Sequence, residues 1–232
     1  MVAQSTTRRP GRTSQIDGDD AVLARALEVT EWVKRNSGIV LGALAALLVL
    51  VAIFFWYRAD RNRRLDDAAI AYLQVEQSAQ IGDEATAARD LQEFIQRHDG
   101  TPYADEARVL LGQIQLRAGR AQEAIPVLQP VAEKLNGSLV GPQAALLLAT
   151  ARATTGDAPG AIEAYLRVAN QSDSQFRQTE GLMGAALLRS EGGDHAGAAE
   201  LYRRLVDMQE AGSADRSLFE MRLAEEEALA GR

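Results

Sequence analysis

The hydrophobic pattern changes once along the chain. Residues 38–57 are twenty consecutive uncharged residues, almost all of them apolar. Beyond Leu65, small and apolar residues return instead at a fixed interval among charged ones. A continuous apolar run predicts a buried or membrane-spanning helix, and a fixed interval predicts a repeated helical unit. The sequence therefore divides into an apolar helix and a repeat body.

The apolar run has the length and the flanks of a membrane anchor. At about 1.5 Å per residue, twenty helical residues reach roughly 30 Å, the thickness of a bilayer's hydrocarbon core. Lys34 and Arg35 precede the run, and Trp56 and Tyr57 close it, where aromatic rings favour the headgroup region. We therefore expect a transmembrane helix over residues 37–58.

Two other interpretations of this run fit less well. Core helices seldom extend so far without a polar face, and the apolar region of a cleaved signal peptide is shorter, about 7–15 residues. The run also begins late and ends in FFWYR, without the small residues of a cleavage site. We expect an anchor that is not cleaved.

Positive charges on the two sides of the anchor bear on its orientation. Within about 20 residues of the run, the amino-terminal side carries three Lys and Arg residues and the carboxyl-terminal side carries four, while the whole amino-terminal tail carries six. Long domains cross a membrane largely regardless of charge, so the short tail counts for more. The pattern favours a tail inside and a body outside, and charge counting alone leaves the inverted topology open.

The segments beside the anchor have distinct compositions. Residues 1–18 are rich in Ser, Thr, Arg and Gly and are predicted to be disordered. Residues 19–36 predict a short amphipathic helix that either lies on the membrane surface or extends the anchor helix. Residues 59–65 predict a basic juxtamembrane linker.

Four glycines mark an internal repeat in the body. Gly82, Gly119, Gly156 and Gly193 are separated by 37 residues each. An Ala follows each Gly by five residues, a Leu or Tyr follows it by nine, and three of the four are followed directly by Asp. Agreement at several offsets makes chance a poor explanation, so these are repeats.

The residue types explain what each repeat unit forms. Gly adopts the left-handed conformation that ends a helix, and the following Asp caps the next helix. The small Ala lets two helices approach closely, while the Leu or Tyr one turn later fills the adjoining groove. Each unit is thus predicted to be an antiparallel helix pair, which buries its apolar faces only by stacking on its neighbours.

These units resemble the tetratricopeptide repeat (TPR). The resemblance rests on the segments GDEATAARDL (82–91), GRAQEAIPVL (119–128), GDAPGAIEAY (156–165) and GDHAGAAELY (193–202). It implies an all-α fold, with a TPR-like α-solenoid of antiparallel helix pairs over residues 66–232. That domain comprises about four units and a C-terminal capping helix. A period longer than the usual value of about 34 residues predicts longer helices or loops.

Two local features modify the regular pattern. Pro126 and Pro130 fall within a second helix and are predicted to bend or shorten it, because Pro lacks the N–H donor. Residues 217–230 are predicted to form one further helix, equivalent to the first helix of a unit, which caps the stack. We expect its glutamates on a solvated face: Glu220, Glu225, Glu226 and Glu227.

Composition leaves little catalytic chemistry. The absence of Cys excludes disulfides, thiolate metal sites and Cys nucleophiles, and neither His98 nor His195 has a second imidazole within helical reach. Residues 1–64 carry ten basic and six acidic residues, whereas residues 65–232 carry fifteen and twenty-six. A body with a net charge of −11 disfavours nucleic-acid binding. We expect a non-catalytic protein with no metal or other cofactor.

Stacked helix pairs present a curved groove lined mainly by the first helix of each pair. The inward positions implied by the TPR resemblance are partly polar and partly apolar, which suits an extended polypeptide or a partner's helix. Ordinary packing between repeats is an equally good reason for their residue types. The positions are Tyr72, Glu76, Glu106, Val109, Gln113, Gln143, Leu146, Thr150, Met183 and Leu187.

The order of basic tail, single span and helical repeats resembles the ancillary SecYEG translocon subunit family (YfgM-like). The resemblance rests on residues 31–72, EWVKRNSGIVLGALAALLVLVAIFFWYRADRNRRLDDAAIAY, which lead directly into the repeats. It implies a bacterial inner-membrane protein with a periplasmic C-terminal domain, which contacts the Sec translocon and periplasmic chaperones and assists export without catalysis.

Two alternatives share the same architecture. One is an anchored TPR scaffold for cell-division or envelope-biogenesis complexes, and the other is a cytoplasm-facing adaptor with inverted topology.

Overall fold

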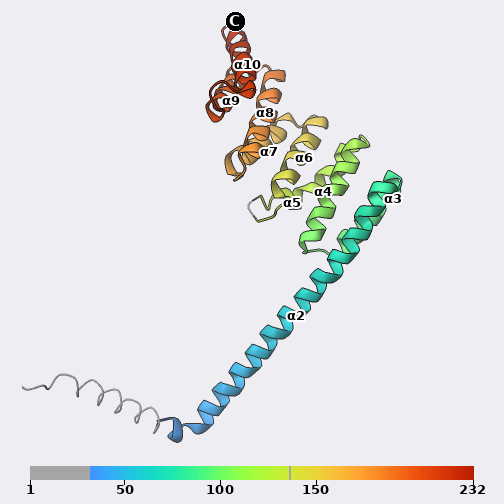
Figure 1. The fold of residues 1–232 in the computed structure, drawn as a ribbon, viewed down its shortest axis with the longest axis vertical. Helices are drawn as coiled ribbons and strands as arrows, with labels where there is room; N and C mark the ends of the chain where they lie inside the picture. The colour runs from blue at the N-terminus through green and yellow to red at the C-terminus, as the bar shows by residue number, and fades with distance from the viewer. Residues whose placement is uncertain (1–31, 136) are drawn as a thin grey trace, which may run out of the picture. The chain divides into compact units, whose positions relative to one another are not determined.

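The computed structural model describes residues 32–135 and 137–232, and within these ranges every regular element is an α-helix (Figure 1). This confirms the predicted all-α fold class. The predicted tail 1–18, and all but the end of the predicted helix 19–36, lie outside the described residues. The helices are α2 (Ser37–Ile81), α3 (Glu84–Arg97), α4 (Pro102–Arg117), α5 (Ala121–Ala132), α6 (Gly141–Thr154), α7 (Ala158–Gln171), α8 (Gln175–Glu191), α9 (His195–Met208) and α10 (Ala214–Ala230).

Helix α2 is a single element of 45 residues. It contains the apolar run, the basic segment 59–65 and the first helix of the first repeat unit. The basic segment was predicted as a linker, but it is helical throughout, because it consists mainly of good helix formers and has no Gly or Pro. The chain nevertheless divides into two compact units within this helix, between Asn62 and Arg63.

The first unit holds the apolar part of α2. Side chains 41–57 are all exposed, with 72% exposure at Leu41 and 71% at Trp56. Within the described residues, α2 is the one helix long and apolar enough to cross a membrane, and none of its most apolar window is buried. Because proteins in water rarely leave so large a continuous apolar surface uncovered, this exposure argues against a core helix.

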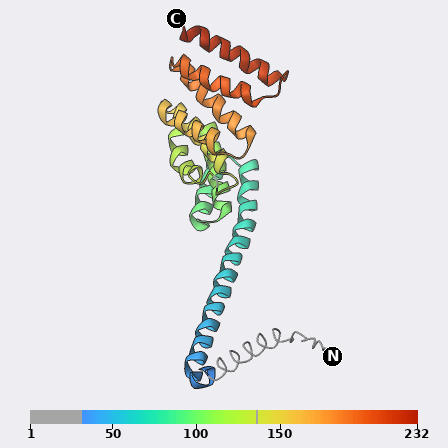
Figure 2. The same cartoon turned by 90° about the vertical axis from the view of Figure 1, so that its left-hand side faces the viewer.

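The second unit, Arg63–Arg232, is a stack of helix pairs. The end of α2 pairs with α3, and α4 with α5, α6 with α7, and α8 with α9, while α10 packs on α9 (Figures 1 and 2). Its buried apolar residues form three clusters that follow one another along the stack, around Leu91, Leu128 and Leu205. This arrangement of successive local cores is that of an α-solenoid.

The repeat glycines end three of the first helices as predicted. Gly119, Gly156 and Gly193 have positive φ angles of 72°, 86° and 81°. In each case the N–H of the next residue donates to the carbonyl five residues before it, at 2.7, 2.9 and 2.9 Å. These bonds are the six-to-one bonds of a Schellman motif, which satisfies carbonyls left free at a helix end.

The first repeat glycine behaves differently, so that part of the prediction was wrong. Gly82 does not adopt a positive φ, and its N–H donates to the carbonyl of Ser78 at 2.7 Å. Only Gly82 and Asp83 separate α2 from α3, whereas three residues separate the helices of each later pair. The shorter connection leaves no additional residue for a Schellman turn.

The other repeat positions confirm their predicted roles. The carboxylates of Asp83, Asp157 and Asp194 accept backbone N–H bonds as N-caps, whereas Arg120 makes no side-chain cap bond. Each Ala five residues after a repeat Gly is at most 1% exposed, which lets the paired helices approach; these are Ala87, Ala124, Ala161 and Ala198.

The two prolines shorten their helix as predicted. Helix α5 contains Pro126 and Pro130 and has 12 residues, compared with 14 in each of α3, α7 and α9. Turns follow α5 at residues 133–135 and precede α6 at residues 139–140.

Candidate partner-binding groove

The first helices of the pairs present the predicted groove residues in three columns. The first column consists of residues spaced 37 apart, which are Tyr72, Val109, Leu146 and Met183. The second column changes character along the stack, because it runs Glu76, Gln113, Thr150 and Leu187. The third column contains the predicted residues Glu106 and Gln143, and its next equivalent position is Glu180, which was not predicted. The second column therefore offers an acidic group at the start of the stack and an apolar group towards its end.

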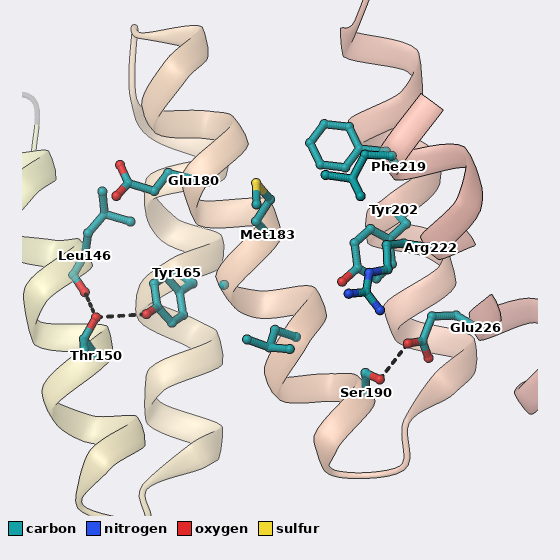
Figure 3. Close-up of a pocket in the computed structure, with 13 residues that line it drawn as sticks. Leu146, Thr150, Tyr165, Glu180, Met183, Ser190, Tyr202, Phe219, Arg222 and Glu226 are labelled. Carbon is teal, nitrogen blue, oxygen red and sulfur yellow. Dashed lines mark hydrogen bonds between the residues drawn. The ribbon is translucent and has the colours of Figure 1, made fainter. Parts of the chain in front are cut away.

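The apolar end of these columns opens into a cavity of about 440 Å³ (Figure 3). Four of the predicted residues line it, and they come from α6 and α8: Leu146, Thr150, Met183 and Leu187. In the first column, the exposed fraction of the side chain rises from 6% at Leu146 to 43% at Met183. Leu187 on α8 and Leu218 on α10 are 53% and 43% exposed, so the cavity presents uncovered apolar side chains.

One wall of the cavity is fixed by a close approach of α7 to α8. A Cβ atom on Gly184 would lie 2.7 Å from the ring of Tyr165, so the missing side chain makes room for this ring. The Tyr165 hydroxyl lies 3.0 Å from Oγ1 of Thr150, which in turn donates to the Leu146 carbonyl at 3.0 Å (Figure 3). The phenol thus bridges α6, α7 and α8.

The opposite wall carries a buried carboxylate, which corrects a prediction. Glu226 on α10 is 4% exposed and not solvated, because its oxygens accept a bond from Ser190 at 2.6 Å and lie 2.8 Å from Nδ1 of His195. The other three terminal glutamates are exposed. Burial by itself would raise the pKa of Glu226, but hydrogen bonds from Ser190 and His195, and the positive charges of His195 and Arg222, lower the pKa overall.

This Ser–Glu–His cluster fastens helices together and lacks the geometry of a nucleophile relay. In such a relay the imidazole contacts the hydroxyl and removes its proton. Here Glu226 stands between Ser190 and His195 and contacts both. Among the described residues there is also no group of three or more His, Asp or Glu side chains that could hold a metal ion. The polar contacts of this cluster join α8, α9 and α10.

The other six predicted groove residues do not line this cavity. Tyr72 and Val109 are buried among repeats, with 9% and 5% exposure. The remaining four are half-buried: Glu76, Glu106, Gln113 and Gln143. The structure therefore gathers four of the ten predicted positions at one cavity and leaves the others along the preceding helices.

Several residues of the cavity were missed by sequence reasoning. Tyr165 and Tyr202 carried a signal, since both stand nine residues after a repeat Gly, where the first two units have a buried Leu. Phe219, Arg222 and Glu226 come from α10, for which no groove positions were predicted.

The fold and the groove define a class of helical-repeat protein, and comparison with known proteins agrees. The chain belongs to the tetratricopeptide repeat-like domain family, whose match extends over residues 30–228. The matched region includes the apolar run as well as the repeats.

A solved structure supports the same fold. The chain is similar to the nearly identical TPR-like repeats of a candidate kinesin light chain from Podosopora anserina, with 17% identity and a TM-score of 0.55. The similarity covers 70% of this chain and 86% of that one. No curated protein matched the sequence. Domains of this kind are generally protein–protein interaction modules.

Proposed function

We propose that this protein is a membrane-anchored docking module, which binds a polypeptide partner in the groove of its repeats. The observation that carries the proposal is the cavity between α6 and α10, with Met183, Leu187 and Leu218 uncovered on its walls. Exposed apolar side chains beside fixed polar groups are what a groove needs to bind an extended segment or an amphipathic helix. No bond is made or broken in this activity.

The anchor is the second part of the proposal. The length and exposure of the apolar part of α2 support a single membrane span. The six Lys and Arg residues of the short tail before the span support a cytoplasmic amino terminus and a periplasmic repeat domain in a bacterial inner membrane. A reporter fused after Arg232 that is active only in the periplasm tests this orientation, and activity of a cytoplasm-only reporter would establish the inverted one.

For the partner, the resemblance to the ancillary SecYEG subunit family supports a role in export. In that role the anchor lies beside the Sec translocon, and the groove receives emerging chains or periplasmic chaperones. The family match over residues 30–228, which includes both anchor and repeats, is consistent with anchoring and docking being parts of one function.

Site-specific crosslinking tests the docking function directly. A photoreactive amino acid at Leu187, in the cavity, should crosslink to a polypeptide in intact cells. The same amino acid at Glu200, exposed on α9 outside the cavity, is the matched control. Translocon subunits or chaperones among the products would support the export role, and division or envelope proteins alone would replace it. Equal crosslinking from both positions would contradict docking in the groove.

A further inference from the structure

At the start of the predicted groove, three polar groups stand without partners. Tyr72 on α2 is 9% exposed, yet its hydroxyl makes no hydrogen bond to any residue that the structure describes. Glu76, one turn further along α2, and Glu106 on α4 are half-buried. Neither carboxylate has a hydrogen bond or an ion pair within the described ranges. A polar side chain as buried as that of Tyr72 usually has a partner.

Aromatic contacts hold the three groups near one another. The Tyr72 ring centroid lies 5.8 Å from that of Phe94 and 5.9 Å from that of Tyr103. Tyr103 stands one helical turn before Glu106, and Tyr72 one turn before Glu76, so the contact between the rings brings the two acidic side chains together. Burial, with the negative charges of Glu76 and Glu106, raises the pKa of Tyr72 to about 12.

The electrostatics of this group call for a positive charge. Burial raises the pKa of Glu106, and repulsion from Glu76 raises it further. The chain therefore holds two like charges close together and partly out of water, where neither is neutralised by a described residue. A cation between them would replace this repulsion with attraction, and a guanidinium group could also lie on the adjoining aromatic faces.

We propose that Glu76, Glu106 and Tyr72 form a subsite for an arginine or lysine side chain of the polypeptide that binds in the groove. The inference rests on the proposed docking function and specifies its ligand. Because the second column changes from Glu76 to Leu187 along the stack, one bound segment can place a basic residue at this subsite and an apolar residue in the cavity. The partner is thus a basic, amphipathic segment, whose charge complements the acidic repeat body.

Binding of three synthetic peptides tests the inference. The peptides share the same leucines and differ only in carrying arginine, glutamine or glutamate at the remaining polar positions. The full chain is reconstituted in nanodiscs of zwitterionic lipid, and empty nanodiscs serve as the blank. Charge-assisted hydrogen bonds should make the arginine peptide bind at least about tenfold more tightly than the glutamate peptide.

Variants assign that preference to the subsite. The double variant Glu76→Gln/Glu106→Gln should lose most of the preference for arginine, and Tyr72→Phe should lose part of it. Glu163→Gln, which neutralises an exposed carboxylate on α7, should keep it. Because the double variant removes an unfavourable repulsion, its unfolding midpoint should be equal to or higher than that of the wild type, so unfolding would not explain a loss of binding.

The other outcomes separate this inference from the docking function. If Leu187→Glu weakens all three peptides equally while their charge has no effect, docking in the groove stands and the cation subsite is wrong. An arginine peptide that fails to bind also overturns the subsite, and docking is then decided by crosslinking in cells. Saturable calcium binding that disappears in the double variant would identify a metal site and overturn the peptide ligand.

Discussion

His195 at the start of α9 and Glu226 on the capping helix α10 meet side chain to side chain, with Nδ1 of His195 2.8 Å from Oε2 of Glu226. The second oxygen of Glu226 accepts a hydrogen bond from Ser190 on α8. One buried carboxylate therefore joins the last helix to both helices of the preceding pair. Its neighbours also include Tyr202, whose pKa is raised, chiefly by burial.

This carboxylate predicts that acid weakens the capping helix. The pKa of Glu226 is lower in the folded chain than in the unfolded one, where a Glu has a pKa of about 4.3. Its contribution to stability is therefore complete above that unfolded value and is lost as the pH falls through the lower folded value. Thermal midpoints of the wild type and Glu226→Gln across this range should converge in acid.

At neutral pH the same variant should be destabilised by about 1–3 kcal/mol, since two hydrogen bonds to a charged acceptor are weakened. Glu227→Gln is the control, because Glu227 is exposed and its pair with Arg203 lies on the surface. A constant difference between wild type and Glu226→Gln at every pH would contradict the assigned titration.

The left-handed turns predict a backbone cost for Ala at a repeat glycine. Gly193 has a φ of 81° with no atom near an added Cβ, so any loss in Gly193→Ala comes from conformation and not from a clash. We expect a loss of about 1–2 kcal/mol in the unfolding free energy. Gly231→Ala is the comparison, because Gly231 has a φ of −85° and its added Cβ would meet only an ordinary contact at 3.6 Å. Equal losses in the two variants would disprove this explanation.

The contact between α7 and α8 predicts different tolerances at two neighbouring glycines. A Cβ on Gly181 would lie 2.6 Å from the backbone oxygen of Tyr165, and a helix can relieve that clash only by moving away. A Cβ on Gly184 would meet the Tyr165 ring, which can rotate. Calorimetry should show a loss of about 1–3 kcal/mol for Gly181→Ala and a smaller one for Gly184→Ala. The reverse order would show that the ring cannot adjust.

The second repeat unit lacks a helix cap, and one substitution there is expected to increase stability. Arg120 precedes α5 with φ −97° and ψ 51°, close to the φ −83° and ψ 66° of the capping Asp157, but it forms no cap bond. Arg120→Asp should therefore raise the unfolding free energy by about 0.5–1 kcal/mol. The substitution removes only a 3.8 Å surface contact with Glu123, which contributes little.

A second substitution at Arg120 tests the cap without the charge of a carboxylate. The later units pair their capping Asp with an Arg five residues earlier, as Arg152 with Asp157 and Arg189 with Asp194. The second repeat unit has the buried Gln115 in place of this Arg, and the side-chain oxygen of Gln115 has no hydrogen-bond partner among the described residues. Arg120→Asn, which caps without a charge, should give a similar gain. A stability loss in both variants would contradict the cap as the missing interaction.

The sequence by itself determined the helical repeat, because its signals act locally. A Gly that ends a helix, an Asp that caps the next and an Ala that permits close approach each work within one turn, so a fixed spacing of 37 residues was sufficient to define the units. The sequence also predicted the apolar helix directly, since twenty consecutive uncharged residues match the length of a membrane span.

Tertiary structure decided what depends on contacts between distant residues. Whether Gly82 takes a left-handed turn depends on where α2 ends, and whether Glu226 is solvated depends on Ser190 and His195, 36 and 31 residues away. The cavity likewise collects residues from five successive helices. A repeat period predicts which positions are equivalent. Which of these positions remain exposed depends on the sizes of the neighbouring side chains and on where the helices end. Both take effect only when the helices are stacked.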